Sequence, residues 1–529
     1  MESQIESVKA LDAYRLRQVK HIPELNSDGM ILEHKKTGAN IFLMSNEDNN
    51  KVFCIGFRTP PSDSTGVPHI IEHTVLCGSD KFPVKDPFVE LVKGSLNTFL
   101  NAMTYPDKTV YPIASCNDTD FQNLMDVYMD AVFHPNIGKE KKIFMQEGWH
   151  YELEDPEGEL TYNGVVYNEM KGAFSSPDDV LERLILNSLF PDTSYANESG
   201  GDPEHVLDSY IHTALFPDTC YGVESGGDPE DIVKLTYEDY LAFYHKYYHP
   251  SNSYIYLYGD MDMTEKLRWL DEEYLGKYDR KEIDSEIQIQ KKFKEPIERE
   301  IFYSVSESES LDHATYLSIN TQAGNELSPK EYVAFQILEY VLLDAPGAPL
   351  KKALLDAGIG DDIMGGYEYG ILQPYFSVIA KNAEREQKDE FVKIVKAELK
   401  KLADGGIDKK CLKAGINNYE FQYREADYGS TPKGLMYGLQ CLDSWLYGGD
   451  PMMHLEYEDT FAALKKGADS GYFEGLIRTY LLDNPYEAVV IASPKKNLTA
   501  RIEEQTAKKL KEYKDSLSKE EIDELIRQT

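Results

Sequence analysis

The sequence lacks the features that would place it in a membrane or in an oxidising compartment. A membrane-spanning helix needs a run of about 20 apolar residues, and the sequence contains no such run. Its six cysteines are scattered and include no C-x-x-C pair, which is typical of reduced thiols rather than of a disulfide framework. The N-terminal stretch, MESQIESVKALDAYRLRQVKHIPEL, has no apolar signal core and carries acidic residues that transit peptides avoid. These absences predict a cytoplasmic protein that does not engage a membrane.

Positive charge is also scarce. The chain has 55 Lys and Arg against 92 Asp and Glu, a formal net charge of −37. This balance disfavours nucleic acids and anionic membranes as partners, and it would attract basic peptides at low salt. A soluble, acidic surface with no special partner explains it equally well. Apolar residues make up 41% of the 529 residues, enough for substantial cores, and the length fits two large domains or three to four smaller ones.

The stretch Pro68–Gly78, PHIIEHTVLCG, carries His69, Glu72 and His73 in the order H-x-x-E-H. Residues four apart share one face of a helix, so both imidazoles can reach one zinc ion at ~2.0–2.1 Å. Glu72 can lean over the same site and take a proton from a water molecule there. The order is the reverse of the H-E-x-x-H motif of zinc peptidases. A solvated helix face that carries two histidines by chance is the alternative, and the apolar residues around the motif argue against it.

A third ligand is needed, because zinc hydrolases commonly use three protein ligands. The stretch Gly164–Gly172, GVVYNEMKG, offers Glu169 after a short β-branched run. Together with HIIEHTVLCGSDKFPVKDPFVELVKGSLNTFLNAMTYPDKTVYPIAS, FMQEGWHYELED and GVVYNEMKGAFSSPDD, it makes the sequence resemble the presequence-protease branch of the pitrilysin family, the inverzincin metallopeptidases. The resemblance covers nearly the whole chain.

This resemblance implies one zinc ion per chain, with three protein ligands and a general base. The implied ligands are His69, His73 and Glu169, and the implied base is Glu72. It also implies that Asn101 and Ala102, in LNAMTYPD, lie along an edge strand that pairs with the backbone of the substrate.

The order of the predicted elements indicates an α+β fold, since strands are followed by helices and then by strands again. In the first part we expect strands at Met30–His34, Ala39–Ser45, Lys51–Phe57 and Tyr254–Tyr258, and helices at Phe121–Phe133 and Lys141–Trp149. In the second part we expect strands at Tyr316–Asn320, Tyr375–Ala380 and Ala488–Ala492, and helices at Pro329–Leu343 and Leu350–Ala357.

The family is built from repeats of such a unit, of which only the first binds metal. The resemblance therefore implies two units, each an antiparallel sheet with helices packed on one face, plus a partial C-terminal helical hairpin. We expect a catalytic unit over residues 1–265, a metal-free unit over 266–494 and an incomplete helical linker over 495–529.

The catalytic part contains a tandem repeat that departs from the family pattern. Val180–His205 and Val206–Asp231 align with 16 identities and share LFPDT and ESGGDPE. The family shows one copy, and the second copy resembles it more. We interpret the repeat as a helix-loop duplication shortly after Glu169, with an effect on the site that the sequence leaves open.

The end of the chain is a second departure. Leu510, Tyr513 and Leu517 form an apolar stripe on a charged helix, and Ser518 with Glu521 fits a capping box that begins another helix. This pattern is similar to the helical hairpin that joins the two halves of the family's chain, which is about twice as long. In the family, an Arg and a Tyr from the other half complete the active site, so here they would come from another chain or be absent. A C-terminal half of the same family and self-association are the possible partners.

The sequence therefore predicts a zinc-dependent endopeptidase that hydrolyses short, unfolded peptides. A different class of function is the alternative: a catalytically weak or inactive half that binds peptides or a partner chain as an interaction subunit. A structural zinc module is a third possibility, but a closed four-ligand site would have no use for Glu72.

Overall fold

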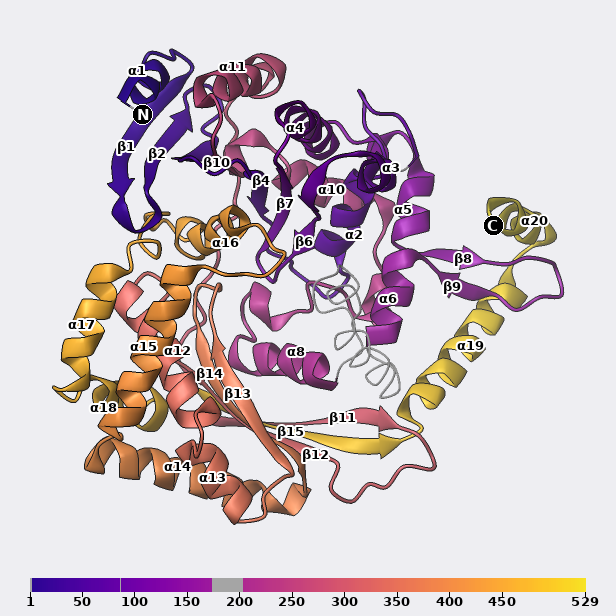
Figure 1. The fold of residues 1–529 in the computed structure, drawn as a ribbon. Coiled ribbons are helices and arrows are strands. Elements are labelled where there is room, and N and C mark those ends of the chain that lie inside the picture. The colour runs from indigo at the N-terminus through magenta and orange to yellow at the C-terminus, as the bar shows by residue number, and fades with distance from the viewer. Residues whose placement is uncertain (1, 86, 174–202) are drawn as a thin grey trace.

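A computed structural model describes residues 2–85, 87–173 and 203–529 as an α+β fold with two large sheets (Figure 1). The first sheet has the strand order β1-β2-β3-β10-β4-β7-β5, and β6 also pairs with β7. Its strands are β1 Tyr14–Ile22, β2 Ser27–His34, β3 Asn40–Ser45, β4 Lys51–Arg58, β5 Asn97–Leu100, β6 Met103–Thr104, β7 Lys108–Ser115 and β10 Ser253–Gly259. The second sheet has the order β11-β15-β12-β14-β13. Its strands are β11 Ile297–Val305, β12 Thr315–Gln322, β13 Asp362–Glu368, β14 Tyr375–Ala383 and β15 Glu487–Lys496.

Helices and one small hairpin complete the fold. The hairpin consists of β8 His150–Glu152 and β9 Thr161–Asn163. We call the residues before β11 the first part of the chain and those from β11 onward the second part. The helices of the first part are α1 Glu2–Lys9, α2 Val67–Val75, α3 Pro87–Gly94, α4 Asp118–Phe133, α5 Lys141–Glu147, α6 Val165–Ala173, α8 Pro203–Leu215, α9 Pro229–Ile232, α10 Tyr237–Tyr247 and α11 Met263–Glu273. Those of the second part are α12 Pro329–Glu339, α13 Pro349–Asp356, α14 Lys388–Gly405, α15 Lys409–Glu425, α16 Lys433–Trp445, α17 Glu458–Ala468, α18 Tyr472–Leu476, α19 Leu498–Ser516 and α20 Lys519–Gln528. No helix in the described ranges is both long and apolar enough to cross a bilayer.

The segments that local periodicity predicts form the expected elements, although they are a minority of all elements in the fold. The strands expected near residues 30, 40, 51, 254, 316, 375 and 488 are β2, β3, β4, β10, β12, β14 and β15, and the expected helices are α4, α5, α12 and α13. The nine-residue edge strand β1 was not predicted, because its alternation of basic and apolar residues is weak.

Both sheets are mixed, which differs from the expected antiparallel pairing. β10 enters the first sheet between β3 and β4 and runs parallel to β3. β15 likewise enters the second sheet between β11 and β12 and runs parallel to β11. A parallel pair needs a long crossover connection, and here helices separate each inserted strand from its partners along the chain.

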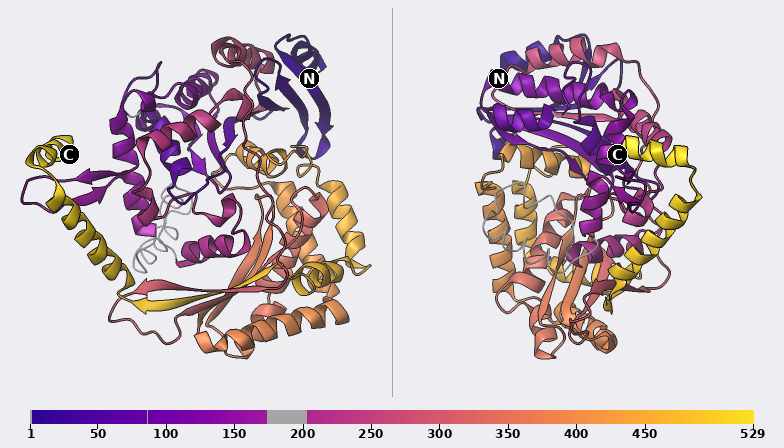
Figure 2. Two further views of the ribbon diagram at one scale, coloured as in Figure 1. Left: turned by 180° about the vertical axis from the view of Figure 1, so that it is seen from behind. Right: turned by 90° about the vertical axis from the view of Figure 1, so that its right-hand side faces the viewer.

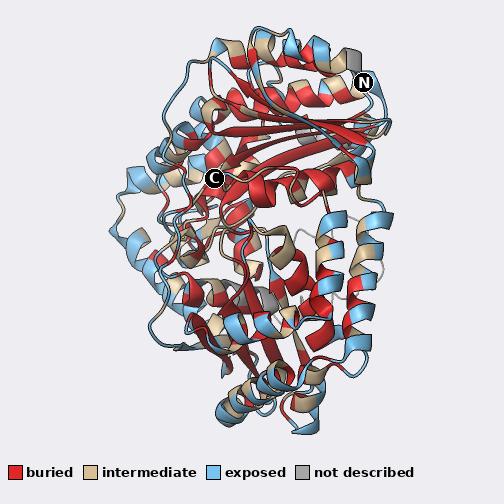
Figure 3. Cartoon of the chain, turned by 90° about the vertical axis from the view of Figure 1, so that its left-hand side faces the viewer, coloured by how far each residue is buried: buried red, intermediate tan, exposed pale blue. Residues whose placement is uncertain are grey.

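Helices cover both faces of each sheet, whereas we expected them on one face. In β3, Ile41 and Leu43 face the core with α2 and α4, and Phe42 and Met44 face α16. The consequence is visible in Figure 3, where the inner strands of both sheets are buried and much of the exposed surface belongs to the outer helices. The edge strands β1 and β11 are more exposed. Strands buried on both faces need nearly continuous apolar sequence, as KVFCIGFR in β4 and SYIYLYG in β10 provide.

The second covering helix comes from the other part of the chain in each case. α16 of the second part lies directly on the first sheet because Gly434 and Gly438, one turn apart, leave room for the rings of Tyr258 and Tyr256. α8 of the first part packs on the second sheet and lies between the sheets in Figure 1. This exchange of helices joins the two parts into one packed body.

The C-terminal helices α19 and α20 run along one side of the molecule and reach the β8–β9 hairpin (Figure 2). Leu510 is buried against Leu153 and Leu160, and the ring of Tyr513 stacks on Tyr151 with centroids 5.0 Å apart. The chain itself therefore buries Leu510, whereas Tyr513 stays 41% exposed beside Tyr151. The predicted capping box of Ser518 and Glu521 begins α20.

The first repeat copy lies outside the described residues, except for its last three, which begin α8. The second copy, Val206–Asp231, forms most of α8, the short 3-10 turn Cys220–Gly222 and the start of α9.

Candidate metal centre

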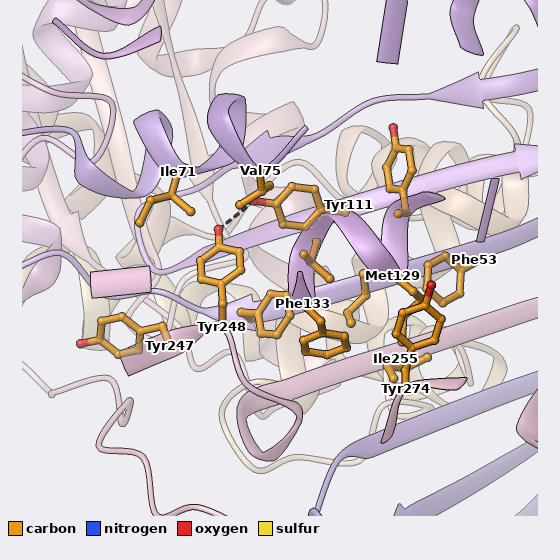
Figure 4. Close-up of a cluster of buried hydrophobic side chains, with 14 of the residues drawn as sticks. Phe53, Ile71, Val75, Tyr111, Met129, Phe133, Tyr247, Tyr248, Ile255 and Tyr274 are labelled. Carbon is orange, nitrogen blue, oxygen red and sulfur yellow. Dashed lines mark hydrogen bonds between the residues drawn. The ribbon is translucent and has the colours of Figure 1, made fainter. Parts of the chain in front are cut away.

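The helix α2 carries the H-x-x-E-H motif and packs on a layer of buried tyrosine rings, which we call the tyrosine floor. Gly66, at φ 66°, caps its N-terminus and Pro68 lies in its first turn. On the inner face, Ile71 and Val75 lie over Tyr111 and Tyr248, whose hydroxyl groups share a hydrogen bond of 2.8 Å (Figure 4). The buried face fixes the rotation of the helix, so His69 and His73 share the partly exposed side.

Glu169 comes from the middle of α6 and meets both histidines. Its Oε2 lies 3.7 Å from Nε2 of His69 and 3.8 Å from Nε2 of His73. The three donor atoms all lie within 4.8 Å of one another, and within residues 2–85, 87–173 and 203–529 no other group of three His, Cys, Asp or Glu side chains converges in this way.

Each histidine is oriented by a partner at its other ring nitrogen. Nδ1 of His69 donates to the carbonyl oxygen of Gly226 at 3.0 Å, and Nδ1 of His73 lies 3.4 Å from Oε2 of Glu147. Such partners fix the tautomer, which leaves both Nε2 atoms for a metal ion. Two imidazoles and one carboxylate with an open side are the donor set of a catalytic zinc site, so the residues fit zinc.

The contact between His73 and Glu147 shifts the pKa values of both side chains. Burial lowers the pKa of His73, but the hydrogen bond to Glu147 and the carboxylates of Glu72 and Glu169 outweigh it and raise the pKa to about 9. Burial raises the pKa of Glu147, but the bonds from His73 and Gln146 outweigh this and hold the pKa below its usual range.

Glu72 lies on α2 beside the three donors and is half-buried. Burial raises the pKa of Tyr128, and the charge of Glu72 raises it further. The charge of Glu72 thus affects the pKa of both His73 and Tyr128.

Asn101 and Ala102 connect β5 to β6 at the edge of the first sheet. The backbone N–H of Asn101 donates to Pro112 at 3.3 Å, and its carbonyl oxygen accepts from the hydroxyl of Tyr128 at 3.2 Å. The backbone of Asn101 is thus turned inward.

Glu147 and Gly226 were not recognised in the sequence. The sequence signal for Glu147 was its place near the apolar residues of KKIFMQE. A carboxylate that is buried there needs a hydrogen-bond partner. No local signal pointed to Gly226, because its contact with His69 joins residues 157 positions apart.

Two sequence models that describe domains of one peptidase family match this chain. Insulinase (Peptidase family M16) matches residues 52–198, which include the three donors and Glu72, and Peptidase M16 inactive domain matches residues 234–419. The chain belongs to the M16, or pitrilysin, family of peptidases.

Curated relatives agree with this family. Protein HypA of Clostridium perfringens is 50% identical over 97% of this chain and 50% of its own length. Presequence protease 1, chloroplastic/mitochondrial, of Arabidopsis thaliana is 40% identical over 96% of this chain and 45% of its own length. The chain spans about half the length of these relatives.

Solved structures show the same fold at low identity. A protease from Helicobacter pylori superposes with a TM-score of 0.61 at 15% identity, over 91% of this chain and 99% of that one. Pitrilysin superposes with a TM-score of 0.58 at 15% identity, over 91% of this chain and 47% of its own.

Proposed function

We propose that this M16-family chain is a zinc-dependent endopeptidase that hydrolyses short, unfolded peptides. The observation that carries the proposal is the convergence of two imidazoles from α2 and one carboxylate from α6, with Glu72 beside them. Presequence proteases among the relatives make peptides the natural substrate class.

His69, His73 and Glu169 would hold the zinc ion, with Gly226 and Glu147 orienting the two imidazoles. Zinc, when bound, polarises the peptide carbonyl and makes the attacking water more acidic. Glu72 accepts the proton of that water and then passes it to the leaving amine. Its half-buried position beside the donors suits both transfers.

The substrate would bind as an added strand at the β5–β6 edge. The backbone at Asn101 and Ala102, between β5 and β6, would pair with an extended peptide. A folded protein presents no free extended segment to such an edge, which limits substrates to unfolded peptides. The net charge of −37 favours basic ones at low salt.

We further propose that residues 1–265 and 266–494 are two units of one type. In both sheets the last strand enters between a parallel and an antiparallel neighbour, and α12 follows β12 as α2 follows β4. Residues 495–529 would then lead towards a C-terminal half, which supplies donors for the oxyanion. Loss of one such donor typically lowers the rate by ~10²–10³. The cytoplasmic location stays a prediction.

A second candidate is a weak or inactive half that binds peptides, or its partner, as an interaction subunit. It predicts peptide binding without turnover.

The deciding experiment measures zinc content and cleavage of a quenched fluorescent peptide together. Glu72→Gln should keep one zinc per chain and lose cleavage by about 10²- to 10⁴-fold, because an amide cannot accept the proton of water. His69→Ala and Glu169→Ala should release the metal. Glu90→Gln, an exposed glutamate on α3, is the matched control. Unchanged cleavage in the Glu72 variant would refute the assigned base, and zinc without any turnover in the wild type would favour the interaction subunit.

A further inference from the structure

The second repeat copy contacts the N-terminal end of α2 next to the metal centre. Besides the bond from His69 to Gly226, the backbone N–H of Asp228 donates to the carbonyl oxygen of Ser64 at 2.8 Å. The N–H of Glu224 donates to the hydroxyl of Ser64 at 3.1 Å. Residues 224–228 therefore hold both the loop before α2 and the first histidine, and we call them the clasp.

The clasp approaches α2 too closely for side chains. A Cβ on Gly66 would lie 2.6 Å from the carbonyl oxygen of Gly226, and a Cβ on Gly227 would lie 2.9 Å from Cα of Gly66. Both Gly66 and Gly227 also have positive φ, of 66° and 106°, which only glycine adopts without strain. Backbone therefore rests on backbone here, so the clasp fixes the position of Gly226.

The other end of the second copy is anchored away from the metal centre. Along α8, Leu207, Ile211 and Leu215 pack on the second sheet. The hydroxyl of Tyr221 donates to Asp107 at 2.6 Å and accepts from the N–H of Leu372 at 2.9 Å. The copy is thus held between the second sheet and His69.

Most residues that make these contacts are the same in both copies, although His212 and Ala214 of α8 are Leu186 and Ser188 in the first copy. Leu207, Ile211, Leu215, Phe216, Tyr221, Glu224, Gly226, Gly227 and Asp228 correspond to Leu181, Ile185, Leu189, Phe190, Tyr195, Glu198, Gly200, Gly201 and Asp202. Gly222 differs, because its counterpart is Ala196. A Cβ on Gly222 would lie 2.6 Å from the carbonyl oxygen of Phe216 and 2.9 Å from Cα of Pro217. These are backbone atoms in the turn that leads into the clasp, so an alanine there would push the clasp out of place.

We infer that residues 206–231, and not residues 180–205, position His69 for metal binding, and that Gly222 decides between the two copies. The inference rests on the proposed zinc site. Copy 180–205 is then dispensable for zinc binding. Placed in the same position, it would bring the methyl group of Ala196 into the place where Gly222 has no side chain.

The test compares deletions of one copy each, which leave the chain in the same register. Metal-free wild type, Δ180–205, Δ206–231 and Δ206–231 with Ala196→Gly are titrated with Zn²⁺ against a chelator of known affinity. Zinc affinity of Δ180–205 should equal that of the wild type, and Δ206–231 should bind about 10- to 100-fold more weakly, the usual effect of losing an outer partner of a ligand. Ala196→Gly should restore the affinity. The Co²⁺ absorption spectrum, which reports the ligand geometry, should change and recover in parallel.

A second pair of variants covers the case in which Δ206–231 does not fold. In Δ180–205, Gly222→Ala should weaken zinc binding, whereas Gly475→Ala, at a helical glycine with open space around its Cβ, should not. Equal zinc affinity of both, or a Δ206–231 that folds and binds zinc like the wild type, would overturn the inference alone. A wild type that binds no zinc would overturn the proposed function itself.

Discussion

A buried acidic cluster between the two sheets should make the protein less stable as pH rises, and Asp443→Asn should remove part of that loss. The cluster consists of Asp107 before β7, Lys108 on β7, Glu326 before α12 and Asp443 on α16, and all four are buried. The ammonium of Lys108 donates to the carbonyl oxygen of Gly370 at 2.7 Å and lies 3.5 Å from Oδ1 of Asp107. One cation thus faces three carboxyl groups.

The magnitude follows from the pKa of Asp443. Burial raises this pKa, the charge of Lys108 and the bond from Tyr332 offset part of the rise, and the result is about 6 against an ordinary value of 3.8. A carboxyl group with a raised pKa favours the folded state at pH below its unfolded value, and this stability is lost as pH rises through 6. The shift corresponds to about 3 kcal/mol of lost stability at pH 8. The amide introduced by Asp443→Asn does not ionise, and its oxygen can still accept the 2.9 Å bond from Tyr332.

The assay is urea unfolding of the metal-free chain at pH 4 and pH 8, followed by tryptophan fluorescence. Trp445 lies two residues after Asp443 on α16 and is buried, so it reports this interface. The unfolding midpoint of Asp443→Asn should exceed that of the wild type at pH 8 and equal it at pH 4. Lys108→Met is the control of opposite sign and should destabilise by about 3–5 kcal/mol, because it leaves buried carboxylates without their cation. A midpoint for Asp443→Asn that falls by the same amount at both pH values would refute the reasoning.

Three further predictions concern the metal centre, the partner and the C-terminal helices. Glu147→Gln should weaken zinc binding by about 10- to 100-fold, measured by chelator competition, because the charged partner of His73 is lost; unchanged affinity would remove Glu147 from the site. Adding the C-terminal half of the Clostridium perfringens relative as a separate polypeptide should raise peptide turnover, and a rate independent of its concentration would contradict the need for a partner. Leu510→Ala should speed proteolysis of α19 and α20, because the cavity costs about 2–5 kcal/mol of local packing against Leu153 and Leu160; digestion at the wild-type rate would show that this contact does not hold the helices.

Local sequence patterns were enough for much of the fold and for the candidate ligands. The alternation in β2 to β4 and the helical spacing in α4 and α12 depend on neighbours a few residues away, so periodicity reveals them. The spacing of His69 and His73 depends on helix geometry alone. Glu169 was found because GVVYNEMKG resembles a family stretch, and the structure brings its carboxylate to within 3.8 Å of both imidazoles.

The amino-acid sequence by itself thus indicated part of the helices and strands and the candidate metal-binding side chains. Only the tertiary structure decided which distant segments meet: β10 and β15 enter between earlier strands, α8 and α16 cover each other's sheets, and Gly226 and Glu147 orient the histidines. An apolar stripe predicts that one face of a helix is buried, but it does not predict which sheet covers that face, because the hydrophobic effect has no direction. A backbone carbonyl such as that of Gly226 has no side chain to mark it, so its role exists only once the chain has folded.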